Sequence, residues 1–265
     1  MDIKDRERKI IKKFGIQDTI WDTTKLSTFI DILKENPWLS GSFVNIQGVY
    51  KDTALMYASQ YSNTDSTEET VKILLDAGAN PDIKNTLGCT PLMLASRYSN
   101  TTSTEETVRM LLYAGANPDI QTVIGETALI IASEYSNTTS TEETVKILLD
   151  AGANPDIQTE IVETALIIAS KYSNTKSTEG TVKILLNAGA NPNIQDKDGK
   201  TALMLASRST NHLSSEITVK ILLDAGANPD IQDKDGKTAL IYASEHSNTT
   251  STEETARMLL DAGAN

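Results

Sequence analysis

Residues 53–80 have the sequence TALMYASQYSNTDSTEETVKILLDAGAN, and this stretch decides the fold because it recurs along the chain. Its opening pattern, Thr-Ala/Pro-Leu-x-x-Ala-Ser, returns every 37 residues, at Thr53, Thr90, Thr127, Thr164, Thr201 and Thr238. Its closing pattern, Leu-Leu-x-Ala-Gly-Ala-Asn, ends at Asn80, Asn117, Asn154, Asn191, Asn228 and Asn265. Repetition at a period of about 20–50 residues is typical of proteins whose units bury their apolar faces only by stacking on one another.

The sequence of each copy, numbered repeat 1 to repeat 6, predicts two helices joined by a polar loop. In repeat 1 the first helix is expected near residues 53–61, where small and apolar residues share one face. The second helix is expected to open with a Ser-x-x-Glu capping box, in which the Ser66 hydroxyl accepts from the Glu69 amide. Gly78 suits a helix C-terminus because glycine adopts positive φ at little cost, and Pro81 prevents continuation.

At this point the sequence resembles the ankyrin repeat family. Residues 196–204, DKDGKTALM, match the start of that family's pattern, and residues 89–95, CTPLMLA, keep its proline. The resemblance covers about residues 48–265 and implies an all-α ankyrin-repeat solenoid of stacked helix–loop–helix pairs with projecting β-turn or hairpin tips. We therefore expect six repeats over residues 48–265, with first helices that start near residues 53, 90, 127, 164, 201 and 238.

Two features depart from the family pattern. The family's usual histidine is replaced by apolar residues, which predicts apolar packing at Met56, Met93, Ile130, Ile167, Met204 and Ile241. The loop between the two helices is also longer than usual and rich in Ser, Asn and Thr, as at residues 61–66. Nearly identical repeats with such loops look like the ankyrin arrays encoded by giant DNA viruses.

The N-terminal segment resembles a degenerate repeat. We expect residues 1–47 to form a helical cap with a helix near residues 26–33, and the sequence Asn45-Ile46-Gln47 echoes Asp156-Ile157-Gln158. Terminal repeats need a modified outer face, and the aromatic residues expected to close the apolar end of the stack are Trp21, Trp38 and Phe43.

Composition excludes several classes of function. The formal net charge of −12 argues against a nucleic-acid partner, because such surfaces need clustered Lys and Arg. No apolar run is long enough for a membrane span, and the N-terminus lacks a secretory signal. The single cysteine, Cys89, fits a reducing intracellular location, which we expect to be cytoplasmic, and in a host cell if the protein is viral. The sequence shows no catalytic, metal or cofactor motif, so no cofactor and no enzymatic activity are expected.

The tips before each first helix differ between repeats and are the first candidate for a partner-binding surface. Repeats 5 and 6 have polar tips, at residues 196–200 and 233–237. The earlier tips carry apolar or β-branched residues where the family keeps polar ones: Val49, Tyr50, Thr86, Leu87, Val123, Ile124, Ile161 and Val162. Exposed apolar patches usually mark interaction sites, so this pattern favours binding, and the alternative is that each tip only packs on its neighbour.

A row of tyrosines at the end of the first helix is the second candidate. It comprises Tyr61, Tyr98, Tyr135 and Tyr172, in the same repeats as the apolar tips. Tyrosine is favoured at interfaces because it joins a rigid apolar ring to a polar hydroxyl. A tyrosine repeated at one position more often packs the loop beneath it, and for this row we favour that structural role.

The function that follows is a protein–protein interaction scaffold, in which a monomeric chain binds another protein through its tips and concave face. Two alternatives stay open at this stage. One is an adaptor that recruits a substrate to a ubiquitin ligase or another effector. The other is a solenoid without a specific partner, produced by recent duplication or by design of the repeat.

Overall fold

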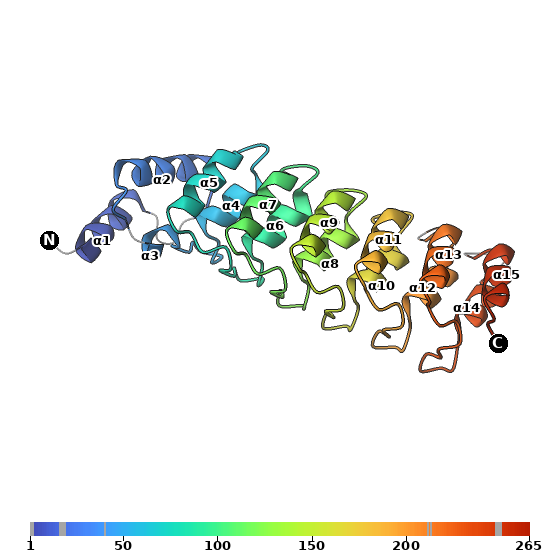
Figure 1. Cartoon of the computed structure of the whole chain (residues 1–265). Coiled ribbons are helices and arrows are strands. Elements are labelled where there is room, and N and C mark those ends of the chain that lie inside the picture. The colour runs from blue at the N-terminus through green and yellow to red at the C-terminus, as the bar shows by residue number, and fades with distance from the viewer. Residues whose placement is uncertain (1–2, 16–19, 40, 211, 213, 247–250) are drawn as a thin grey trace. The chain divides into compact units, whose positions relative to one another are not determined.

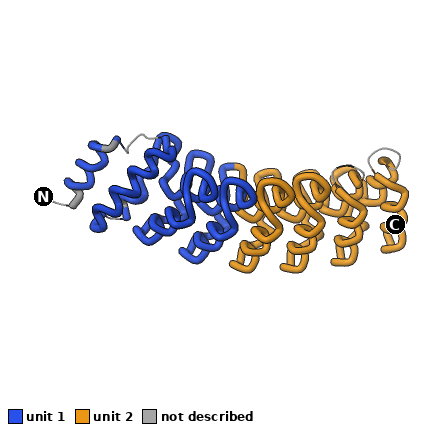
Figure 2. Tube along the Cα trace, turned by 90° about the horizontal axis from the view of Figure 1, so that it is seen from above, with its two compact units in different colours: residues 1–123 blue, residues 124–265 orange. Residues whose placement is uncertain are grey.

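The structure is a computed structural model that describes residues 3–15, 20–39, 41–210, 212, 214–246 and 251–265. It divides into two compact units, residues 1–123 and residues 124–265, which Figure 2 shows in different colours. Unit 1 holds the N-terminal segment with repeats 1 and 2, and unit 2 holds repeats 3 to 6. No helix in the described ranges is both long and apolar enough to cross a membrane.

The predicted all-α fold is confirmed, and the helices are paired as in Figure 1. The helices of unit 1 are α1 (Ile3–Phe14), α2 (Thr23–Glu35), α3 (Gly41–Val44), α4 (Ala54–Gln60), α5 (Glu68–Asp76), α6 (Pro91–Tyr98) and α7 (Glu105–Tyr113). Those of unit 2 are α8 (Ala128–Glu134), α9 (Glu142–Asp150), α10 (Ala165–Lys171), α11 (Glu179–Asn187), α12 (Ala202–Arg208), α13 (Glu216–Asp224), α14 (Ala239–Glu245) and α15 (Glu253–Asp261). Strands are absent from the described residues.

Each first helix follows the repeated threonine, and in repeats 1 to 5 most of its residues are buried. In repeat 1 the Thr53 hydroxyl accepts a hydrogen bond from the Met56 amide, 3.2 Å away, which satisfies an amide that the first turn leaves unpaired. Leu55 and Ala58 are buried on this helix because α4 packs on α5 within its repeat and on α6 of the next. Full burial of a leucine side chain contributes about 1.5–3 kcal/mol, so most of the stabilisation arises between neighbouring helix pairs.

The predicted apolar replacement of the family's histidine holds in five of the six repeats. Met56, Met93, Ile130, Ile167 and Met204 are buried, whereas Ile241 in repeat 6 is exposed. In repeats 1 and 2 the methionine sulfur also accepts from the backbone amide of the capping threonine, at 3.4 Å in both cases. The substitution therefore keeps one polar contact of the helix start while filling the core.

The predicted capping box at Ser66 is wrong by one residue. The second helix of repeat 1 is capped by Thr67, whose hydroxyl accepts from the Thr70 amide at 3.2 Å. The serine is used elsewhere: in repeat 2 the Ser103 hydroxyl donates to the Ser59 carbonyl of the preceding repeat at 2.6 Å. The glutamate that follows the cap also reaches its neighbour, because Glu68 accepts from the Thr104 hydroxyl at 2.7 Å.

Buried hydroxyl groups join successive repeats within each unit. Ser173 in repeat 4 lies 3.1 Å from the Ser214 hydroxyl and 2.6 Å from the Thr218 hydroxyl of repeat 5, and all three residues are buried. Equivalent groups are Ser62 with Ser103 and Thr107, Ser136 with Ser177 and Thr181, and Thr210 with Ser251 and Thr255. These bonds tie the long loop of one repeat to the second helix of the next.

The N-terminal segment packs on repeat 1 through aromatic residues. Trp21 and Phe43 are buried on either side of Phe29, with ring centroids 5.2 and 5.3 Å from the Phe29 ring. The Trp21 indole also donates to the Asp52 carbonyl at 2.9 Å, and α2 contacts both α4 and α5. The expectation for Trp38 is wrong: this residue is 38% exposed and lies under the Arg6 guanidinium instead of in the core.

We predict that Ser173→Ala lowers the free energy of unfolding by about 1–3 kcal/mol, because it leaves the buried hydroxyls of Ser214 and Thr218 with one partner fewer. Urea denaturation followed by circular dichroism measures the change. Ser27→Ala, at an exposed position of α2, serves as control and should shift stability by less than about 0.5 kcal/mol. Wild-type stability of Ser173→Ala would contradict a role for the hydroxyl network.

Candidate partner-binding surface

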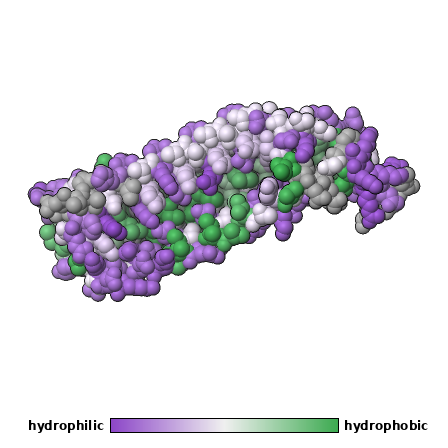
Figure 3. Space-filling view, turned by 180° about the vertical axis from the view of Figure 1, so that it is seen from behind, coloured by the Kyte–Doolittle hydropathy of each residue, from purple (hydrophilic) through white to green (hydrophobic). Residues whose placement is uncertain are grey.

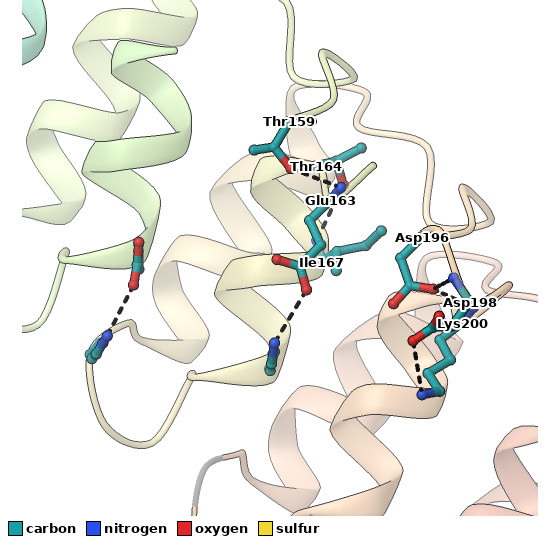
Figure 4. Close-up of polar contacts among 10 residues, drawn as sticks. Thr159, Glu163, Thr164, Ile167, Asp196, Asp198 and Lys200 are labelled. Atoms are coloured by element: carbon teal, nitrogen blue, oxygen red, sulfur yellow. Dashed lines mark hydrogen bonds and ion pairs between the residues drawn. The ribbon is translucent and has the colours of Figure 1, made fainter. Parts of the chain in front are cut away.

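The tips are tight turns closed by backbone hydrogen bonds. In repeat 5 the Asp196 amide donates to the Lys200 carbonyl at 2.8 Å, and the Asp196 carboxylate accepts from the amides of Asp198 and Lys200. Thr159 takes this place in repeat 4, and its hydroxyl accepts only from the Glu163 amide, at 3.1 Å (Figure 4). The turn therefore keeps its form while its side chains change from polar to apolar.

Successive tips nest closely at the turn glycine that repeats 2, 3, 5 and 6 share. Gly125 has φ of 82°, and a Cβ atom there would lie 2.7 Å from the Glu160 nitrogen of the next tip. The same approach lets the Glu160 amide donate to the Ile124 carbonyl at 3.0 Å. Gly88 is placed in the same way against the backbone of residues 122 and 123. Neighbouring tips within a unit thus form a continuous backbone edge.

Repeat 4 breaks this rule at Val162, which stands where Gly125 and Gly199 stand in the neighbouring repeats. Val162 has φ of 65°, a conformation that is unfavourable for a β-branched residue. The bond that would join its tip to the next, from the Lys197 amide to the Ile161 carbonyl, is missing among the described residues of unit 2. A side chain alone does not break this bond, because Lys51 stands at the equivalent position of repeat 1 with φ of 59° and the Thr86 amide still donates to the Tyr50 carbonyl at 3.0 Å.

The predicted tip residues are exposed, with one exception. Thr86 in unit 1 is exposed. The exception is Val162 in unit 2, which is half-buried. The large hydrophobic tip residues are 46–62% exposed, and they are Val49, Tyr50, Leu87, Val123, Ile124 and Ile161. Figure 3 shows hydrophobic residues over the first repeats of unit 2 and hydrophilic ones over the tips of repeats 5 and 6.

The four predicted tyrosines are half-buried, and their rings contact side chains of the chain itself. Tyr61 packs on Tyr57 with ring centroids 4.7 Å apart, and Arg97 lies over the Tyr98 ring. In unit 2 the Lys176 ammonium lies 5.3 Å from the Tyr135 ring centroid and 5.2 Å from that of Tyr172. These contacts agree with the structural role that the sequence favoured for this row.

A groove lies beside the tips of repeats 3 and 4 and has a volume of about 280 Å³. We call it the repeat 3–4 groove. Its lining residues are Ile124, Glu126, Glu134, Thr159, Glu160, Ile161, Glu163, Ile168 and Tyr172. Two predicted tip residues and one predicted tyrosine therefore come together here. The sequence did not predict that four glutamates gather here, because they come from separate tips and helix ends.

Two of these glutamates form ion pairs with lysines of repeat 4. Glu134 lies 3.0 Å from the Lys176 ammonium and Glu163 lies 3.2 Å from that of Lys171. The hydrogen bond and charge of Glu134 raise the pKa of Lys176. Burial alone would lower the pKa of Lys171, but the charge of Glu163 outweighs it and the pKa is raised. Both lysines are therefore cations at neutral pH and compensate the charges of Glu134 and Glu163.

The tip of repeat 6 is held by a carboxylate–phenol contact. The Tyr242 hydroxyl donates to Asp233 at 2.5 Å, and burial together with this bond raises the pKa of Tyr242. Burial alone would raise the pKa of Asp233, but hydrogen bonds from Tyr242 and from the amides of Lys237 and Asp235 lower it below its ordinary value. The charged form of Asp233 thus stabilises this turn.

Helix pairs of this form, stacked through small apolar faces and carrying nested tips, define a repeat protein of the solenoid class. A family model described as ankyrin repeats matches the chain in three copies, over residues 28–122, 100–179 and 166–265. The chain therefore belongs to the ankyrin repeat family. Among curated proteins, none matches it significantly.

We predict that Gly125→Ala destabilises the protein more than Gly236→Ala does. Both glycines occupy the same turn position at positive φ, so each alanine costs about 1 kcal/mol of backbone strain. Only the Cβ at Gly125 would meet the next tip, whereas nothing lies within 4 Å of that at Gly236. We expect this overlap to add about 1–3 kcal/mol, measured as the difference in unfolding free energy. Equal losses would mean that the tips do not nest.

We predict that Asp233→Asn weakens the pH dependence of stability. A carboxylate whose pKa is lowered by folding stabilises the protein above its unfolded-state pKa of about 3.9, and this contribution is lost as the pH falls through the folded pKa. Asparagine keeps the turn, as Asn85 does in repeat 2, but does not titrate. The unfolding free energy should fall less from about pH 6 to about pH 3 in the variant than in wild type. Identical losses would contradict this account.

Proposed function

We propose that this chain is a protein-binding scaffold whose specificity lies in the tips of repeats 1 to 4. Ankyrin repeats are generally protein–protein interaction modules, which supports the class of function. The observation that carries the proposal is the exposure of large hydrophobic residues at those tips, in contrast to the polar tips of repeats 5 and 6. Exposed apolar groups that lie together usually mark interaction surfaces.

The arrangement of the tips in unit 1 supports this proposal. The Thr86 amide donates to the Tyr50 carbonyl and the Val123 amide to the Leu87 carbonyl, each at 3.0 Å. These bonds bring three tips side by side, so their exposed side chains share one edge. Burying them against a partner would yield about 25 cal/mol for each Å² of apolar area removed from water. Tyr50 adds a rigid ring with a polar hydroxyl, a residue type enriched among interface anchors.

The tyrosine row takes a secondary part in the proposal. Tyr61, Tyr98, Tyr135 and Tyr172 already pack on residues of the chain, and Tyr172 lies beside two tips in the repeat 3–4 groove, so we assign the row to the inner edge of the binding surface. We further propose that the chain acts as a monomer inside a cell, on a partner that is a protein and not a nucleic acid. The acid excess and the single cysteine support this, and the long Ser-, Asn- and Thr-rich loops support an array of the giant-virus type with an N-terminal cap over residues 1–47.

Replacement of tip residues by aspartate tests the proposal. A variant carrying Tyr50→Asp, Leu87→Asp, Ile124→Asp and Ile161→Asp should lose at least about tenfold in affinity for proteins that the wild-type chain retains from a cell lysate, a loss of about 1.4 kcal/mol. Mass spectrometry identifies the retained proteins and titration with each purified protein measures the affinity. Circular dichroism and the melting temperature should stay near wild type because these side chains are exposed.

The matched control removes exposed apolar residues from the second helices. Tyr113→Asp, Ile217→Asp and Leu260→Asp together add similar charge at residues that are 96%, 57% and 56% exposed, and should leave capture unchanged. Equal loss of partners in both variants would show that charge alone weakens binding. Unfolding of the tip variant would show that the tips belong to the core.

A further inference from the structure

Three isoleucines and one tyrosine line the repeat 3–4 groove. Ile124 and Ile161 come from the two tips, Ile168 lies on α10, and Tyr172 follows that helix. The groove is open to solvent and its volume of about 280 Å³ lies at the lower end of the range for pockets that enclose small molecules. Its size and openness suit side chains presented by a segment of another protein.

The groove also carries carboxylates. Four glutamates line it, and Lys176 and Lys171 pair with two of them, Glu134 and Glu163. Glu160 is exposed at the tip and makes no ion pair among the described residues of unit 2. The fourth glutamate, Glu126, lies just before the N-cap of α8. Apolar walls beside such charges reduce screening by water and raise the attraction for a cation.

The same surface two repeats later has the opposite charge. The positions equivalent to Glu126, Glu134, Glu160 and Glu163 hold Lys200, Arg208, Lys234 and Lys237. The positions equivalent to Ile124 and Ile161 hold Asp198 and Asp235. The tips still close in the same way, as the bonds from Thr159 to Glu163 and from Asp233 to Lys237 show. The acidic and apolar character therefore belongs to repeats 3 and 4 and is not required by the turn.

We propose that the repeat 3–4 groove binds a segment of a partner protein in which a lysine or arginine adjoins an apolar side chain. The apolar group enters between Ile124 and Ile161, and the cation meets the exposed carboxylate of Glu160. Phosphate-bearing ligands such as nucleic acids are repelled by the glutamates of the groove. The inference rests on the proposed function and specifies the chemistry of the partner at one of its surfaces.

Selection from a library tests the proposal on the whole chain. The probe is a phage-displayed library of about 12-residue peptides, randomised at every position, selected against the immobilised protein. We expect the enriched peptides to carry Lys or Arg next to a large apolar residue and to bind more weakly as salt is added. Enrichment of acidic or uncharged peptides, or no enrichment over an uncoated surface, would overturn the proposal.

Two substitutions locate the binding site by using residues that the chain itself has at equivalent tips. Glu160→Lys copies Lys234 and Ile161→Asp copies Asp235, so both variants should fold, and each should weaken the synthetic form of a selected peptide at least about tenfold. Lys234→Glu, at the equivalent place in repeat 6, is the control and should leave the affinity unchanged. Equal affinity for wild type and Glu160→Lys would place the peptide elsewhere and overturn the proposal.

Sedimentation of the wild-type chain over a range of concentrations tests a second copy as the occupant. A dimer that forms in wild type and dissociates in Glu160→Lys would give the groove to another copy of this chain and overturn the proposal for a foreign partner. The proposed function has a separate outcome. If the aspartate tip variant loses its partners while Glu160→Lys keeps them all, the scaffold function stands and the inference about the groove falls.

Discussion

The structure depends on contact between consecutive helix pairs, because one pair cannot bury its own apolar face. The first helices meet through residues such as Ala58 and Leu55, which are buried where α4 packs on α5 and α6. Polar groups follow the same order. The long loop of one repeat gives its buried hydroxyl to the next repeat, as Ser173 does to Thr218. Each unit is therefore stabilised by neighbour-to-neighbour contacts rather than by one central core.

This constraint leaves the tips free to vary. In repeats 2, 4 and 5 the first side chain of the tip accepts hydrogen bonds from the turn, and Asn, Thr and Asp all serve, whereas repeat 1 closes its turn with Gly48 at that position. The third residue of the tip is exposed, so it can be Ile in repeats 3 and 4 and Asp in repeats 5 and 6. Val162 shows how far the variation goes, since it keeps a positive φ and loses the bond to the next tip.

Much of the fold could be predicted from the sequence because the signal is repeated in phase. The 37-residue interval, the threonine at each helix start and the glycine after each second helix predicted paired helices, and the structure has them. The capping serine was misplaced because its role is a bond to the preceding repeat, which a pattern within one repeat cannot reveal. Trp38 was misplaced because aromatic character alone does not distinguish a core ring from one stacked under Arg6.

The candidate site was predicted in part. The exposed tips follow from comparing repeats, but the groove depends on how two tips and the end of α10 meet in space. Its glutamates come from separate places in the chain, so their charge is apparent only once the repeats are stacked. The paired lysines add a further layer, because Lys176 both compensates Glu134 and packs on two tyrosines. That contact explains why the tyrosine row, so regular in sequence, is largely engaged within the chain.

Hydrogen–deuterium exchange of the whole chain, with and without a protein that it retains, tests the central claim most directly. The account predicts that binding slows exchange of the amides at residues 85–89, 122–126 and 159–163, while the second helices exchange as before. Protection confined to the second helices, with no change at those tips, would contradict it.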